Sequence, residues 1–186
     1  MKRSLVGLGA LVLVVGGCTD EAGYVLPPKE QAVATATSAE ATTTTATDPS
    51  RPQPLGTSLT LGPEGAEIEV TADEINQDSA PTIMPPGGGH WAGTRVRTCA
   101  KGDPSTRVDV GSSEWSATDA VGVVYNASTL TEVGFPDELY PTASTLTAGQ
   151  CAAGWVMFPA GFKAVLTSVT FTLDSATKAT WTMPVQ

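Results

Sequence analysis

Aromatic side chains, which contribute much of the buried area of a protein core, are almost missing from the first half of this 186-residue chain. Tyr24 is the only aromatic residue before residue 90, and the other ten follow it. Residues 31–50 contain 13 Ala or Thr and no Leu, Ile or Phe. Because such a segment cannot bury enough apolar surface to offset chain entropy, residues 18–56 are predicted to be a disordered Ala/Thr/Pro-rich tether. The folded domain is therefore expected at residues 57–186.

The first seventeen residues have the pattern of a secretory signal peptide. Lys2 and Arg3 precede an uncharged run at residues 4–17, which is shorter than the roughly 20 apolar residues that span a bilayer. Residues 15–18, Val-Gly-Gly-Cys, resemble the bacterial lipobox, and this resemblance implies cleavage before Cys18 and diacylglyceration of its thiol. Two acyl chains make a durable anchor. We therefore expect a lipoprotein on the extracytoplasmic face of the cell membrane; the alternatives are an ordinary secretory signal and an uncleaved anchor.

The chain is acidic, with a formal net charge of −9 and a pI near 4.4. Coulomb repulsion opposes binding to the phosphates of nucleic acid, so no nucleic-acid partner is expected. The same repulsion tends to hold the domain away from an anionic membrane. The tether is then either a stalk that holds the domain at a distance from the membrane or a disordered leader without a function.

The sequence beyond residue 57 consists of short runs in which apolar and polar residues alternate. Val165, Val169 and Phe171, for example, share one face of a strand and are expected in the core. Gly, Pro, Asp and Asn separate the runs, as in turns. Strands are predicted at residues 58–61, 67–70, 94–99, 107–110, 114–117, 121–125, 154–158, 165–173 and 179–183. This number of short strands predicts an all-β sandwich or barrel, and we favour two packed antiparallel sheets because each sheet then buries its apolar face.

Cys99 and Cys151 remain once Cys18 is assigned to the lipid. Outside the cytoplasm two such cysteines are expected to form a disulfide, whereas free redox-active thiols are the alternative. Cys99 shares strand parity with Arg95 and Arg97, so the bridge is expected at a sheet edge or past a bulge.

A family resemblance follows from Cys99, Trp115 and the segment 146–158, which reads Leu-Thr-Ala-Gly-Gln-Cys-Ala-Ala-Gly-Trp-Val-Met-Phe. These residues resemble lipid-anchored or secreted domains of Gram-positive bacteria, especially actinobacteria, related to a small secreted immunogenic antigen of mycobacteria. The resemblance implies an immunoglobulin-like sandwich, a bond between the two cysteines and no established activity. Gly149 stands where the tyrosine corner of antibody domains would need Tyr, so antibody strand order is not implied.

Chemical motifs are sparse. His90 follows Pro85–Gly89 and is expected to be an exposed loop residue, because no G-x-S-x-G, H-E-x-x-H or similar motif gives it a catalytic context. The pairs Asp73-Glu74 and Asp137-Glu138 could suggest calcium or glycan cleavage. Neighbouring strand residues point apart, however, so solvated turns are expected.

A copper site built from Met84, Met157, Met183 and His90 is the metal alternative, but strand parity favours the core for Met183. No catalytic residue, metal or cofactor is predicted.

The best interaction candidate is the proline-bounded loop 134–141. Its possible contact residues are Phe135, Asp137, Glu138 and Tyr140, joined by His90 and Trp91 from the preceding loop. The alternative is that the aromatic residues of the loop pack onto the sandwich as a plug. The sequence thus favours a non-catalytic module that binds an envelope protein or a wall polymer; the alternative is an envelope hydrolase that uses carboxylate chemistry.

Overall fold

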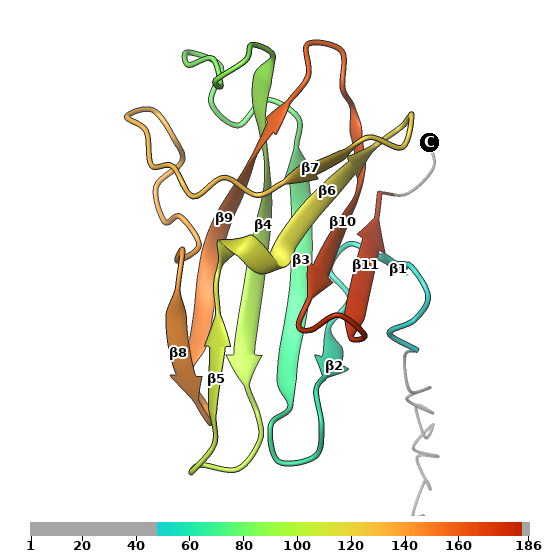
Figure 1. Ribbon diagram of the computed structural model, residues 1–186, viewed down its shortest axis with the longest axis vertical. Coiled ribbons are helices and arrows are strands. Elements are labelled where there is room, and N and C mark those ends of the chain that lie inside the picture. The colour runs from blue at the N-terminus through green and yellow to red at the C-terminus, as the bar shows by residue number, and fades with distance from the viewer. Residues whose placement is uncertain (1–47, 184–186) are drawn as a thin grey trace, which may run out of the picture. The chain divides into compact units, whose positions relative to one another are not determined.

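The computed structural model describes residues 48–183 (Figure 1). The predicted signal peptide, Cys18 and most of the predicted tether lie outside the described residues. The described part contains eleven strands and one short 3-10 helix, η1 (Ser112–Glu114). The strands are β1 (Gln53–Pro54), β2 (Leu59–Leu61), β3 (Ile68–Asn76), β4 (His90–Ala100), β5 (Arg107–Val110), β6 (Trp115–Asp119), β7 (Val124–Asn126), β8 (Ser144–Thr147), β9 (Cys151–Ala160), β10 (Leu166–Thr172) and β11 (Lys178–Thr182).

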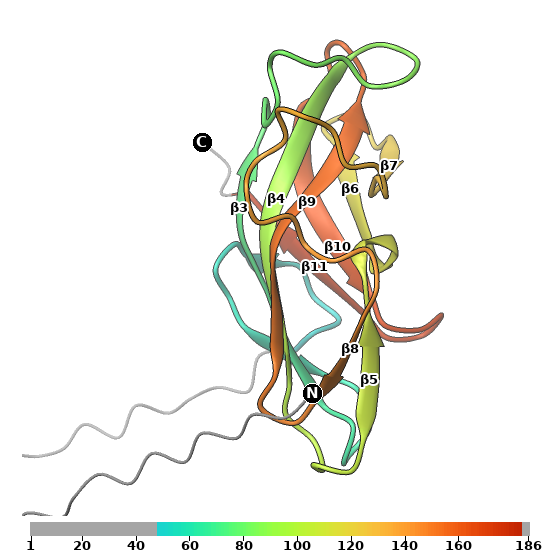
Figure 2. The ribbon, with the colours of Figure 1, turned by 90° about the vertical axis from the view of Figure 1, so that its left-hand side faces the viewer.

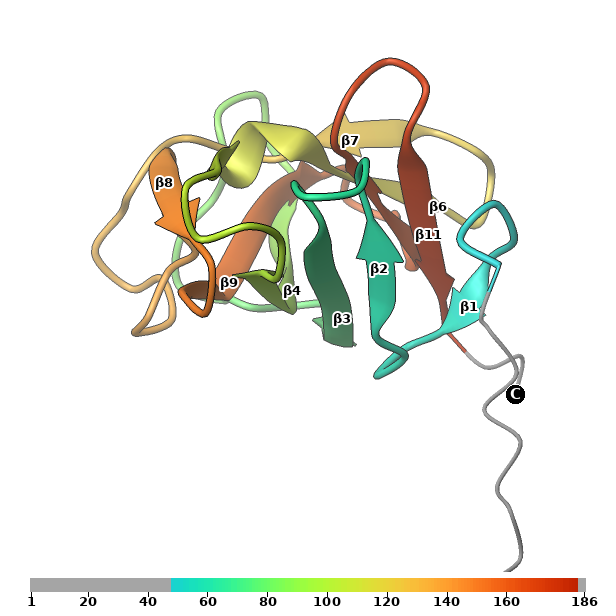
Figure 3. The same ribbon diagram turned by 90° about the horizontal axis from the view of Figure 1, so that it is seen from below.

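These strands form two sheets that face each other, as the side view shows (Figure 2). One sheet has the order β1-β11-β10-β6-β7 and the other has the order β2-β3-β4-β9. A separate pair, β5-β8, lies at the β9 side, as the view from below shows (Figure 3). All pairings are antiparallel except β1 with β11. The predicted all-β two-sheet sandwich is therefore confirmed.

The main core is built around Trp115 of β6. Its ring centroid lies 5.0 Å from that of Phe171 and 5.8 Å from that of Trp181, and all three side chains are buried. The indole N–H of Trp181 donates to the carbonyl oxygen of Thr57, 2.7 Å away. Ile68 of β3 and Phe158 of β9, on the facing sheet, belong to the same core cluster. The three rings all belong to the five-stranded sheet, and together with Ile68 and Phe158 they fill the core between the two sheets.

The sheet begins before the predicted domain boundary at residue 57. Gln53 and Pro54 pair in parallel with Trp181 and Thr182 of β11, so residues 53 and 54 are part of the sandwich. β1 and β8 are strands that the alternation pattern did not predict.

A β-bulge at the start of β10 changes which side chains face the core, so one prediction from the alternation pattern is wrong. The register against β6 shifts between Leu166 and Ser168. As a result Leu166 is fully buried, whereas Val165, which alternation placed in the core, has an exposed fraction of 54%. An extra residue in one strand reverses the faces of everything before it.

The disulfide joins Cys99 to Cys151, as predicted. The two residues are direct cross-strand partners on β4 and β9, and β9 is the edge strand of its sheet. The bond therefore lies within one sheet near its edge, in contrast to the inter-sheet bond of antibody domains.

Breaking this bond by the double replacement Cys99→Ala and Cys151→Ala is expected to lower the free energy of unfolding by about 4 kcal/mol. The bond closes a loop of 52 residues, and the unfolded chain gains that entropy when the loop opens. Denaturant titration measures the change, with the reduced wild-type protein as the control. An unchanged unfolding midpoint in both samples would contradict the entropic role.

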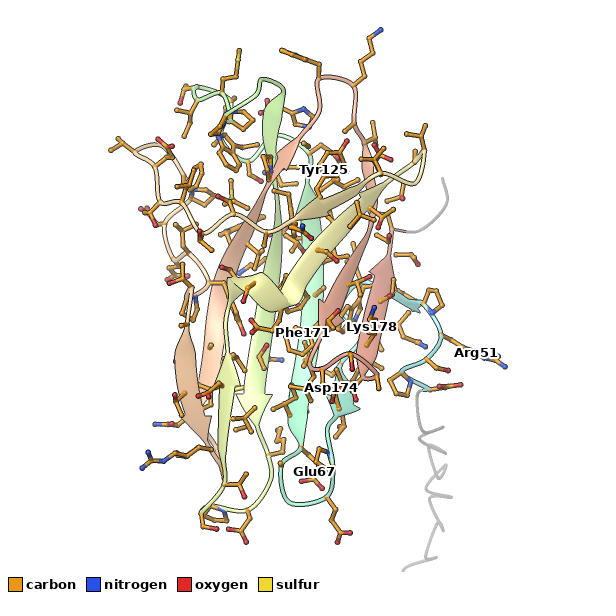
Figure 4. All side chains as sticks on the ribbon, viewed as in Figure 1. Arg51, Glu67, Tyr125, Phe171, Asp174 and Lys178 are labelled. Atoms are coloured by element: carbon orange, nitrogen blue, oxygen red, sulfur yellow. A yellow bond between two sulfur atoms is a disulfide. The ribbon has the colours of Figure 1, made fainter. Side chains whose placement is uncertain are left out.

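Asp119 closes the turn between β6 and β7. Its Oδ1 accepts from the backbone N–H groups of Val121 and Val123 at 3.0 and 2.8 Å. Its Oδ2 accepts at 3.1 Å from the hydroxyl of Tyr125, the side chain labelled in Figure 4. Burial opposes ionisation of this carboxyl group, but these donors outweigh burial and hold the pKa of Asp119 below its ordinary value.

This lowered pKa predicts an acid-sensitive turn. The carboxylate stabilises the fold at any pH above its ordinary pKa of about 4, and the contribution is lost as the pH falls through the lower pKa of the folded state. The melting temperature of Asp119→Asn is therefore expected below that of the wild type at pH 7, with the gap closing in strong acid. Tyr125→Phe, which removes one donor, should show a smaller gap. If the melting temperatures of all three proteins changed with pH in the same way, this assignment would be contradicted.

Candidate functional site

A second, smaller core covers part of the outer face of the β2-β3-β4-β9 sheet. Trp91 and Met157 are buried there with Ala80, and the rings of Trp91 and Phe135 meet edge to face with centroids 4.8 Å apart. Phe135 comes from the long segment between β7 and β8, which crosses to the β9 side (gold to orange in Figure 1). Two distant parts of the chain therefore share one apolar cluster.

The loop residues proposed for partner contact are mostly used inside the protein. Trp91 and Tyr140 have exposed fractions of 1% and 3%, and Phe135 is half-buried. Trp91 and Tyr140 are therefore not exposed for partner contact, and the aromatic side chains of the loop pack on the sandwich as in the alternative described. Asp137 and Glu138 are exposed, and the Glu138 carboxylate lies 3.8 Å from the guanidinium of Arg95.

The end of this loop is fixed to the edge of β9. The backbone N–H of Tyr140 donates to the carbonyl of Trp155, and the N–H of Trp155 donates to the carbonyl of Glu138, both at 2.9 Å. The Tyr140 hydroxyl then reaches into the main core and donates to Oγ1 of Thr98 at 2.9 Å. Burial raises the pKa of Tyr140, and the negative charge of Glu114 adds to the increase. Tyr140 is therefore a neutral hydrogen-bond donor at any ordinary pH.

Between this loop and β9 lies a cavity of about 260 Å³, which we name the side cleft. Its lining includes four hydroxyl-bearing residues, Ser112 from η1 and Ser128, Thr131 and Thr142 from the long segment. The other lining residues are Leu130, Leu139, Tyr140, Pro141, Trp155, Val156 and Met157. The segment is held in place by a hydrogen bond from the N–H of Ser128 to the carbonyl of Met157, 2.7 Å long.

Ser112 is the unusual residue of the side cleft. Its exposed fraction is 3%, and its hydroxyl has no hydrogen-bond partner within residues 48–183. Oε2 of Glu114, two residues later, is also buried without a partner in this part of the chain. Both oxygens are covered by surrounding protein atoms, so a ligand in the side cleft would not reach either of them.

A second, open groove lies on the outer face of the same sheet. Asp73, Glu74, Arg95 and Arg97 line it, and we name it the bulge groove. A register shift lies between Ala72 and Glu74, and Asp73 and Glu74 both line this groove. The pair lies within β3, so the prediction of a solvated turn was wrong. Two acids and two guanidinium groups thus share an exposed surface.

The remaining residues considered for a metal or catalytic site do not lie together in one site. His90 is half-buried and begins β4, opposite Ala160, instead of lying in a loop. Met84 is exposed, whereas Met157 is buried in the second core. No group of three or more His, Cys, Asp or Glu among the described residues is placed to hold a metal ion. None of the described helices is long and apolar enough to cross a membrane.

Sequence reasoning missed the polar wall of the side cleft. Ser112 comes from η1 and the three other hydroxyl residues come from the long segment between β7 and β8, and no spacing marks the four as a group. The sequence feature that could have pointed to the cleft is Trp155, in the Gly-Trp pair shortly after Cys151.

No family model and no curated protein matches this chain. Among solved structures it is similar to MPT63, a secreted protein from Mycobacterium tuberculosis, with a TM-score of 0.54 and 17% identity over 71% of this chain and 96% of that one. It also aligns with the yjhA protein from Bacillus subtilis at a TM-score of 0.45 and 10% identity, over 71% of this chain and 99% of that one. The likeness to MPT63 confirms a shared fold, as the sequence resemblance implied.

Gly154 makes the close approach of the loop to β9 possible, and Gly154→Ala is expected to destabilise the protein by about 2–4 kcal/mol. Its φ is +147°, and a Cβ there would overlap the carbonyl oxygen of Glu138 and the backbone N of Tyr140. Denaturant titration measures the loss, and limited proteolysis should cut earlier within residues 128–142.

Gly149→Ala is the matched control. Gly149 has a φ of +83°, but nothing lies within 4 Å of the added Cβ, so only backbone strain of about 1 kcal/mol is expected. Equal losses in the two variants would mean that the contact with the loop contributes nothing.

Proposed function

We propose that this protein is a lipid-anchored module on the extracytoplasmic face of the cell membrane and that its β-sandwich binds an envelope ligand without catalysing a reaction. The observation that carries the binding role is the side cleft, an uncharged cavity on a rigid scaffold that hydroxyl-bearing and apolar residues line. Loops and clefts that a rigid sandwich holds in place are common binding sites.

Export is supported by three features. The N-terminal residues 1–17 have the pattern of a signal peptide, and Cys18 completes a lipobox-like motif. The Cys99–Cys151 disulfide belongs to an oxidising compartment, because cytoplasmic thiols are kept reduced. MPT63, which shares the fold, is described as a secreted protein.

Binding is favoured over catalysis by the composition of the side cleft. None of its eleven lining residues is a His, Asp, Glu, Lys, Arg or Cys. The cleft therefore holds hydroxyl groups but no side chain that would serve as a general base.

The alternative, an envelope hydrolase that uses carboxylate chemistry, would act through Asp73 and Glu74 in the bulge groove. Both carboxylates are exposed beside Arg95 and Arg97, and such an open surface does not exclude water from a reacting bond. The partner in our proposal is a wall polymer or an envelope protein that reaches the side cleft.

Replacing Cys18 by Ala is expected to release the protein from the membrane fraction into the medium, because the lipid has no attachment site. Thr19→Ala, which changes the neighbouring residue, should stay in the membrane fraction. Mass spectrometry of the wild-type N-terminal peptide should show a diacylglyceryl group on Cys18. An unmodified Cys18 would refute the anchor.

The binding role is measured separately on the released Cys18→Ala chain. It should sediment with purified cell-wall sacculi or with delipidated envelope protein. Absence of both interactions would refute the binding module, whatever the result for the anchor.

A further inference from the structure

We infer that one end of the sandwich docks on a lipid bilayer through three connections between strands. These connections are residues 77–89 between β3 and β4, residues 120–123 between β6 and β7, and residues 161–165 between β9 and β10. We name them together the apolar end. The inference rests on the proposed lipid anchor and goes beyond it, because it assigns a second membrane contact to the folded domain itself.

The three connections lie side by side. The ring of Phe162 lies against Gly88, where an added Cβ would come within 2.9 Å of the ring. The backbone N–H of Ala120 donates to the carbonyl oxygen of Val165 at 3.0 Å. The β9-β10 connection therefore touches both of the others, and the β3-β4 and β9-β10 loops lie at the same end of the ribbon in two views (Figure 1, Figure 2). The apolar end is thus one continuous surface.

Large apolar side chains are concentrated on this surface. Eight of them are exposed among residues 48–183, and five of the eight belong to the three connections: Met84, Val121, Val123, Phe162 and Val165. The exposed fractions of Val121 and Phe162 are 84% and 74%. An exposed apolar patch on a folded domain marks a surface that another molecule or a membrane covers.

Charged side chains are distributed in the opposite way. The apolar end contains one acidic residue, Asp78, and one basic residue, Lys163, which follows Phe162 directly. The connections β2-β3, β4-β5 and β10-β11 at the other end carry four acidic residues and one basic residue: Glu64, Glu67, Asp103, Asp174 and Lys101. Figure 4 shows two of these acidic residues, with their labels below that of Tyr125. The domain therefore has one acidic end and one apolar end.

This distribution lets an acidic protein touch an anionic bilayer. The whole chain has a net charge of −9, but at physiological ionic strength charges are screened beyond a Debye length of about 8 Å. β4 alone, with 11 residues, spans about 35 Å. When the apolar end faces the bilayer, the acidic end is therefore too far away to repel it. Lys163 would then lie beside the lipid phosphates and attract them.

The tether brings a bilayer within reach of this end. Residues 19–47 lie between Cys18 and the described part of the chain, and a chain of this length spans at most about 100 Å. It joins the sandwich through β1, whose Pro54 pairs with Thr182, and Thr182 pairs in turn with Ser168 near the start of β10. The β9-β10 connection ends three residues before Ser168. The anchor would therefore keep the bilayer at a high effective concentration beside the apolar end.

The apolar end suits a bilayer better than a protein partner. Protein interfaces combine apolar anchors with hydrogen bonds and fitted pockets. Here the exposed side chains stand on three separate connections, and neither the side cleft nor the bulge groove includes a residue of these connections. A bilayer requires no matching shape, and affinity for it grows with the apolar area buried and with attraction to anionic lipids.

The test is flotation of the released Cys18→Ala chain, recovered from the medium, with vesicles of phosphatidylcholine alone or mixed equally with phosphatidylglycerol. The chain should float with both, and more strongly with the mixed vesicles. Phe162→Ser and Val121→Ser, each added to this chain, should lower the partition coefficient about three- to tenfold, because each removes an apolar side chain from the lipid.

Leu130→Ser is the matched control. The Leu130 side chain is also exposed, but it belongs to the long segment between β7 and β8, so its replacement should leave the partition coefficient unchanged. All three replaced side chains are exposed, so the melting temperatures should equal that of the parent chain. A loss of flotation is then a loss of lipid contact and not of the fold.

The charge of Lys163 is tested in the same assay. Lys163→Glu should weaken flotation with the mixed vesicles and not with phosphatidylcholine, and high salt should remove the difference. Lys178→Glu, at the start of β11 beside the acidic end, changes the net charge equally and should have little effect. Equal losses in these two variants would mean that only net charge matters.

Three outcomes would overturn the inference: no flotation with either vesicle, equal losses with Phe162→Ser and Leu130→Ser, or a dimer that Phe162→Ser dissociates while vesicles bind nothing. The last result would assign the end to a second copy of the chain. The proposed anchor is judged separately by mass spectrometry of Cys18. An unmodified Cys18 with flotation intact would refute the anchor alone, whereas a diacylated Cys18 with no effect of Phe162→Ser would refute the docking end alone.

Discussion

The free edge of β9 is the constraint on which the rest of the candidate site depends. β9 is the last strand of the four-stranded sheet, and an open strand edge offers unpaired N–H and C=O groups to other chains. Here two backbone hydrogen bonds to Trp155 cover part of that edge with residues 138–140. Before it reaches this edge, the same segment packs Phe135 against Trp91, and residues 128–142 of the segment line the side cleft. The same segment therefore both covers the edge of β9 and lines the cavity.

The tryptophan side chains are distributed over the two cores. Trp115 and Trp181 lie between the sheets, whereas Trp91 lies on the outer face under the long segment. Trp155 belongs to neither core completely: it packs at the border of the second core and also lines the side cleft. A residue held on one side by packing and open on the other is a rigid contact surface, which reduces the entropy lost on binding.

The fold could be predicted from the sequence to the extent that it follows from local alternation. Most strands and the pairing of Cys99 with Cys151 follow from period-2 patterns and from the number of cysteines. The failures occur where one residue is added to a strand: at Glu74 and at Leu166 a bulge changes which side chains face the core, and no local pattern marks the position of a bulge. The side cleft could not be predicted, because its lining combines η1, the segment between β7 and β8, and β9, which only the folded chain brings together.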